Sequence, residues 1–102
     1  MNMRERDIEQ YLREQVKSAG GKAYKWTSPG NSGVPDRIVL LPGGRIAFVE
    51  LKAPGKKPTA LQINQQRCIA GLGMPVVVID SKEGVDELIC KMQTQGGLPQ
   101  WL

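Results

Sequence analysis

Asp36, Glu50 and Lys52 stand near the ends of a stretch that is otherwise typical of a β-hairpin, "PDRIVLLPGGRIAFVELK" from Pro35 to Lys52. Asp36 precedes one apolar run, and Glu50 and Lys52 close the next one. A carboxylate in a partly buried position is costly unless a cation balances it. The two acids and the lysine therefore indicate a cation site, with a structural salt bridge at the end of the sheet as the simpler alternative.

The spacing places these side chains together. If residues 42–44 form a three-residue connection, the numbers of opposed residues add up to 86, and Asp36 faces Glu50 with Cβ atoms roughly 5 Å apart. Lys52 lies on the same face because strand side chains repeat with period 2. A two-residue turn would instead put Asp36 on the other face.

The chain contains no histidine. This excludes Ser-His-Asp hydrolysis, His-ligated zinc and imidazole acid/base chemistry. A site made of carboxylate oxygens alone is typical of Mg²⁺ or Mn²⁺, and Mg²⁺ keeps several waters beside one or two carboxylates. The net charge of +4 favours a polyanionic partner but does not identify one.

The remaining elements follow from periodicity and from breaks in the pattern. A chain of 102 residues forms one domain, here 1–102. We predict helices at 3–19, 59–72 and 81–93, and strands at 22–26, 36–41, 45–52 and 75–80. The unbroken apolar run "PVVVID" predicts a strand that is buried on both faces and parallel to a neighbour. The order α-β-β-β-α-β-α indicates an α/β fold with a small mixed sheet flanked by helices.

The termini and cysteines show no sign of export. The first ten residues are charged throughout, without the apolar stretch of a secretory signal, and no apolar run approaches the ~20 residues needed to cross a bilayer. We expect a cytoplasmic protein with no membrane partner. Cys68 and Cys90 have no metal or redox spacing and are expected to be packing residues.

With these residues in place, the chain resembles a known family. Gly33-Val34-Pro35-Asp36 followed by Glu50-Leu51-Lys52 matches the PD-(D/E)XK nuclease pattern. The string "SPGNSGVPDRIVLLPGGRIAFVELKAPGKKPTALQ" is similar to the stand-alone VRR-NUC domains of phages and bacteria. The likeness covers nearly the whole chain.

The resemblance implies a restriction-endonuclease-like core that cuts DNA with Mg²⁺ or Mn²⁺, in a phage or bacterial host cytoplasm. By the same resemblance, Asp36, Glu50 and the Leu51 carbonyl would ligate the metal. Lys52 would orient water or stabilise developing charge. Since it is flanked by two anions, we expect it to keep its proton and act electrostatically.

Each of the remaining candidate site residues has two possible roles. The family uses an acid from the first helix, and both Glu5 and Glu9 match; either could equally serve the helix dipole. Gln62 matches a family glutamine but also forms a capping box with Thr59. Arg37, Lys56 and Lys57 could contact DNA phosphates or be ordinary solvated cations.

We therefore expect a metal-dependent DNA endonuclease that selects branched, flapped or four-way DNA, because so short a chain has little room for reading sequence. A symmetric homodimer would place two sites on two strands. The alternatives are a catalytically silent DNA-binding or assembly module with the same fold, and a phosphoesterase acting on a nucleotide.

Overall fold

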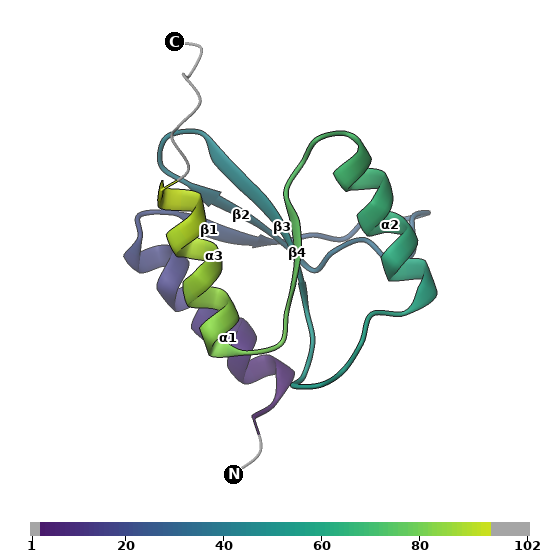
Figure 1. The fold of residues 1–102 in the computed structure, drawn as a ribbon, viewed down its shortest axis with the longest axis horizontal. Helices are drawn as coiled ribbons and strands as arrows, with labels where there is room; N and C mark the ends of the chain where they lie inside the picture. Colours follow the sequence, from purple (N-terminus) through teal and green to yellow (C-terminus); the bar gives the residue numbers. More distant parts are fainter. Residues whose placement is uncertain (1–2, 95–102) are drawn as a thin grey trace.

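Within the described part of the chain, three helices and four strands follow one another in the predicted order (Figure 1). The computed structural model describes residues 3–94. Its elements are α1 (Glu5–Ser18), β1 (Lys22–Lys25), β2 (Arg37–Leu41), β3 (Arg45–Leu51), α2 (Ala60–Gly71), β4 (Val76–Ile79) and α3 (Lys82–Thr94). The strands form one sheet in the order β1-β2-β3-β4, with β1, β2 and β3 antiparallel and β4 parallel to β3. The predicted α/β architecture is confirmed.

The hairpin between β2 and β3 has the predicted register. Residues 42–44 form the turn, Leu41 pairs with Arg45, and Arg37 pairs with Val49. The turn ends in two glycines with φ of +91° at Gly43 and +74° at Gly44, a region that other residues rarely adopt. Since every pair in this ladder adds up to 86, the next pair outward is Asp36 with Glu50.

One face of the sheet carries the hydrophobic core. Every strand pairing joins two odd-numbered or two even-numbered residues, so the odd-numbered side chains of all four strands share a face. This face packs against α1 and α3. The buried core consists of Ile8, Leu12, Val16, Ala23, Val39, Leu41, Ala47, Val49, Leu51, Ile79, Val85, Leu88 and Met92.

The even-numbered face, called the open face below, is only partly covered, and Glu50 at the end of β3 is its buried exception. This corrects one prediction. Val78 of β4 is 41% exposed, so this strand is parallel as expected but is not buried on both faces. Trp26 and Phe48 pack together on the open face with ring centroids 5.4 Å apart. The physical reason is that, within residues 3–94, α2 is the helix beside β4 on this side, and it buries none of its own residues, so most of the face stays uncovered.

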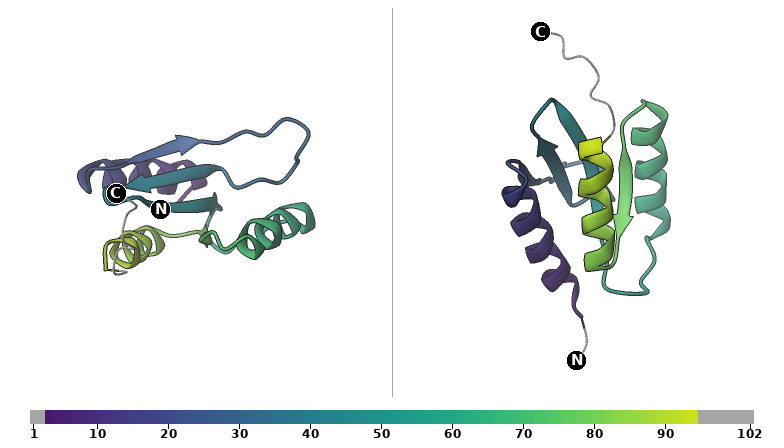
Figure 2. Two further views of the ribbon diagram at one scale, coloured as in Figure 1. Left: turned by 90° about the horizontal axis from the view of Figure 1, so that it is seen from above. Right: turned by 60° about the vertical axis from the view of Figure 1, so that its left-hand side comes forward.

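Helix α2 stands beside β4, on the other side of that strand from α3 (Figure 2, right). Its contacts with the sheet are concentrated on β4. Cys68 in α2 and Cys90 in α3 are both exposed, so the prediction that they pack in the interior is wrong: each falls on the solvent side of its helix. Within residues 3–94, no helix has both the length and the apolar character needed to span a membrane.

Candidate active site

Asp36 and Glu50 lie next to each other where β2 begins and β3 ends. The Asp36 backbone is fixed by its carbonyl, which accepts a hydrogen bond from the Trp26 amide at 2.9 Å. Its side chain is fixed by Oδ2, which accepts from the Leu51 amide at 2.8 Å. The carboxylate therefore accepts the hydrogen bond that a backbone carbonyl would accept in a regular sheet, and it is held against the end of β3.

Glu50 is a buried charge with an incomplete set of partners. The residue is 1% exposed. Its Oε2 accepts from Gln62 Nε2 at 2.8 Å and lies 3.5 Å from Lys52 Nζ, whereas Oε1 is buried with no hydrogen-bond partner. Burial raises the pKa of Glu50 to about 7, the charge of Asp36 adds to this, and Lys52 opposes it. Such a carboxylate is poised to accept a cation.

Gln62 forms the predicted capping box and also contacts Glu50. Its Oε1 accepts from the Thr59 amide at 2.9 Å and its own amide donates to Thr59 Oγ1 at 3.2 Å, which completes the capping box of α2. Its Nε2 is then free to donate to Glu50. One side chain thus joins the start of α2 to the buried acid.

Replacing Gln62 with methionine should separate site effects from helix effects. The variant loses the contact with Glu50 as well as part of the cap, and we expect roughly 10–100-fold weaker divalent-metal affinity, as for other residues that orient ligands. Thr59→Ala is the matched control, because it removes capping at a cost of about 1 kcal/mol and leaves the contact with Glu50 in place. Equal metal affinity in the two variants, measured by calorimetry, would contradict this role.

Gly33 allows the loop before Asp36 to approach α2. Its φ is +89°, and a Cβ here would lie 2.8 Å from the carbonyl carbon and oxygen of Leu61. Gly30 has a similar φ of +85° but no atom within 4 Å of a Cβ. Both glycines serve backbone shape, and only Gly33 is also needed for a close contact.

We expect Gly33→Ala to be more damaging than Gly30→Ala. Each substitution costs about 1 kcal/mol for a left-handed φ, but Gly33→Ala must also displace the start of α2 and, with it, Gln62. Thermal unfolding and metal titration of the two variants measure the difference. Similar losses of metal affinity in both would show that the close contact is not required.

The two acids of α1 have different partners. Glu9 Oε2 forms an ion pair with Arg37 Nη2 at 3.2 Å. Glu5 is exposed, and its negative charge contributes to the raised pKa of Glu50. Glu9 is therefore engaged by Arg37, and Glu5 is the α1 acid whose charge acts on Glu50.

Arg37 points away from Asp36 and Glu50. Its side chain is largely buried, and Nη1 donates to the Ala23 carbonyl at 3.2 Å while Nη2 pairs with Glu9. As an odd-numbered residue, it lies on the face opposite Asp36, which strand alternation alone would have indicated. Lys56 and Lys57, by contrast, are exposed in the loop after β3. These two lysines are accessible to a phosphate, whereas Arg37 is occupied by its partners.

The residues present fit a divalent cation. Among residues 3–94, no three His, Cys, Asp or Glu side chains gather closely enough to hold a metal by themselves. Asp36 and Glu50 supply two carboxylates, and the buried, unpartnered Glu50 Oε1 is an oxygen that lacks only a positive partner. Two carboxylates plus a backbone oxygen and waters match the coordination habit of Mg²⁺.

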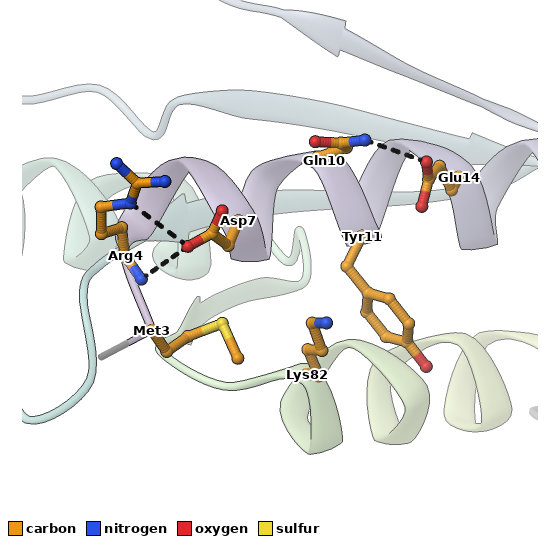
Figure 3. A pocket seen from close by; sticks show the side chains of 7 residues that line it. All are labelled: Met3, Arg4, Asp7, Gln10, Tyr11, Glu14 and Lys82. Atoms are coloured by element: carbon orange, nitrogen blue, oxygen red, sulfur yellow. Dashed lines mark hydrogen bonds and ion pairs between the residues drawn. The ribbon is translucent and has the colours of Figure 1, made fainter. Parts of the chain in front are cut away.

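A separate hollow lies on the helical side of the molecule, between α1 and Lys82 of α3 (Figure 3). Its lining is charged with both signs and includes the Arg4–Asp7 ion pair at 3.5 Å. None of the candidate site residues lines it. We therefore place the chemistry at the end of β3 and not in this hollow.

Two known proteins are similar to this chain over most of its length. No family model matches the chain. It is 51% identical over 81 residues to "Putative nuclease p44" of Acyrthosiphon pisum secondary endosymbiont phage 1, an alignment that covers 79% of this chain and 87% of the relative. A solved structure described as "VRR_NUC domain" superposes with a TM-score of 0.78 at 36% identity, covering 83% of this chain and 92% of the other. The chain belongs to the VRR-NUC family.

Proposed function

We propose that this protein is a nuclease that hydrolyses DNA phosphodiester bonds with Mg²⁺ or Mn²⁺. The observation that carries the proposal is the environment of Glu50: a buried carboxylate with one unpartnered oxygen, opposite Asp36 and within 3.5 Å of the Lys52 ammonium. Membership of the VRR-NUC family and the name of the phage relative support the same activity.

Each residue has a defined task in this proposal. Asp36, Glu50 and the Leu51 carbonyl would hold the cation, and Gln62 keeps Glu50 in position through its Nε2 donor. The bound metal would supply an activated water and polarise the phosphoryl oxygen. Lys52 places a positive charge beside Glu50, where it can offset the negative charge that develops on the phosphate.

The direct test is a panel of labelled duplex, nicked, flapped and four-way DNAs incubated with Mg²⁺, Mn²⁺ or a chelator. Metal-dependent cutting of at least one branched DNA, faster than of plain duplex, is the expected result. Binding without cutting under all conditions would favour the silent DNA-binding module instead. A mononucleotide ester in the same panel tests the phosphoesterase alternative.

The loop after β3 should contribute to DNA affinity. Lys56 and Lys57 are exposed, and the loop is tied to the end of β4 by the Gly55 amide, which donates to Asp80 Oδ2 at 3.2 Å. The logarithm of DNA affinity falls linearly with the logarithm of the salt concentration, and each phosphate contact contributes about 0.9 to the steepness of this fall. Replacing both lysines with glutamine should therefore make the slope less steep by about 2 units. Fluorescence anisotropy at several salt concentrations measures it, and an unchanged slope would place the DNA elsewhere.

We further propose that the enzyme acts as a homodimer through its open sheet face. Leu40, Tyr24 and Val78 are exposed on that face, and Leu61 and Leu72 are exposed in the adjoining α2 region. A helix without buried residues gains little stability from packing against the rest of its own chain. A two-fold dimer through the end of this face that holds Tyr24 and Leu40, away from Glu50, would cover exposed apolar side chains and set two sites on one branched DNA.

Analytical ultracentrifugation without DNA or metal tests the dimer. The wild-type chain of 11.2 kDa should sediment with twice that mass, and Leu40→Glu should return it to the monomer. Met3→Glu is the matched control, because Met3 has the same exposure of 38% but lies at the start of α1, on the far side. A dimer that survives Leu40→Glu would place the interface on another surface.

A further inference from the structure

At the end of β3, the Leu51 carbonyl lies on the side of the strand that faces β2 and the start of the preceding loop. Along β3 the amides of Phe48 and Lys52 donate to the β4 side, to the carbonyls of Pro75 and Ile79, each at 2.9 Å. Alternate residues of a strand bond to opposite neighbours. Val49 and Leu51 therefore bond toward β2, as the Leu51 amide confirms by donating to Asp36.

The printed register of the hairpin ends at Arg37 and Val49, and its continuation points to Pro35 as the residue across from Leu51. Continuing the pairing of Arg37 with Val49 by one further step of two residues places Leu51 against Pro35. In a regular antiparallel pair the two residues would exchange both N–H···O bonds, but here the Leu51 amide donates to the Asp36 side chain instead. Proline has no amide hydrogen, so the Leu51 carbonyl receives no ladder bond from this partner.

Both residues are buried: Leu51 is 1% exposed and Pro35 less than 2%. A buried carbonyl without a donor is rare and costs free energy, which makes it an oxygen in need of a positive partner. It points to the same side of β3 as the Asp36 carboxylate, which the Leu51 amide holds at 2.8 Å.

We propose that Pro35 is a positioning residue that keeps the Leu51 carbonyl free of hydrogen bonds, so that this oxygen can join Asp36 and Glu50 in holding a divalent cation. The inference rests on the proposed function for the identity of the cation. It adds a reason why a proline precedes Asp36: every other residue type would bring an amide hydrogen to the side of β3 on which this carbonyl lies.

The test compares Pro35→Ala with Pro29→Ala, a proline in the same loop that is exposed. In metal-free Pro35→Ala, the amide introduced by the substitution should bond to the Leu51 carbonyl and exchange with solvent far more slowly than the amide of the exposed Gly30. Calorimetry should then show Mn²⁺ affinity reduced roughly tenfold or more, with Pro29→Ala unchanged. A freely exchanging introduced amide, or a protected one with wild-type affinity, would overturn the proposal.

A measurement on the wild type keeps the proposal testable if Pro35→Ala does not fold. The Leu51 carbonyl ¹³C resonance should shift on titration with Mg²⁺. A wild type that binds Mg²⁺ and cuts DNA while this resonance stays still would overturn the role of the carbonyl alone. A wild type that binds neither Mg²⁺ nor Mn²⁺ would overturn this inference together with the proposed function, even if the introduced amide of Pro35→Ala were protected.

Discussion

Replacing Glu50 with glutamine should abolish DNA cleavage while leaving the protein more stable than the wild type in the absence of metal. The variant keeps the size of the side chain and an oxygen that can accept from Gln62, but it removes the charge that binds the cation. Loss of metal-assisted stabilisation worth several kcal/mol corresponds to a decrease in rate of roughly a thousandfold or more. Single-turnover cleavage of the best DNA in the panel measures it.

The gain in stability follows from the pKa of Glu50. Burial raises this pKa from 4.5 to about 7, so between these values the unfolded chain loses a proton that the folded protein retains. Stability contributed by this group is therefore present below pH 4.5, declines as the pH rises to 7, and stays low above it. The ionised acid costs about 3 kcal/mol at pH 8.

Glu50→Gln removes that cost, so its melting temperature in chelator at pH 8 should exceed that of the wild type by roughly 12–24 °C, with little difference at pH 4.5. Added Mg²⁺ should raise the melting temperature of the wild type and not of the variant. Glu87→Gln is the control, since Glu87 is exposed and pairs with Lys91 one turn away. A variant that is less stable than the wild type at pH 8 would show that Glu50 is not a strained charge.

Replacing Lys52 with methionine should reduce the rate of cleavage by about 10²–10³, the usual effect of losing one charge that stabilises a transition state. Lys52 is not among the proposed metal ligands, so Mg²⁺ should still bind. The variant also loses the cation that lowers the pKa of Glu50. Because the ionised form of Glu50 is the one that binds the cation, activity should rise with pH as Glu50 loses its proton. In the variant we expect this rise to begin at a higher pH than in the wild type.

The shape of the pH profile separates this role from a purely structural one. Lys91→Met is the matched control, because Lys91 is an exposed lysine on α3. A Lys52→Met variant with normal Mg²⁺ affinity and a full rate of cleavage would remove Lys52 from the catalytic group. A Lys52→Met variant that fails to bind Mg²⁺ would show that Lys52 supports the metal site instead.

Local rules were sufficient for the hairpin and its site. A three-residue turn with two glycines fixes the register, and a fixed register decides which residues oppose one another. The pairing of Asp36 with Glu50 and the face of Lys52 follow from counting. The same alternation places Arg37 on the opposite face, so the sequence alone was sufficient to separate Arg37 from Asp36 and Glu50.

Interactions between distant segments decided the rest. Glu9 and Glu5 lie one turn apart in α1, and only the packing of that helix against the sheet shows that Glu9 meets Arg37. The exposure of β4 depends on which faces the helices cover, and an apolar strand has the same sequence pattern whether or not a helix lies over it.

By itself, the sequence determined the order of the elements, the register of the hairpin and the pairing of two acids beside a lysine, because these depend on neighbouring residues and a period of two. The tertiary structure alone decided that Glu50 is buried with a free oxygen and that Gln62 serves both a helix cap and this acid. Burial and long-range hydrogen bonds arise only when separate segments meet, and no local pattern encodes where they meet.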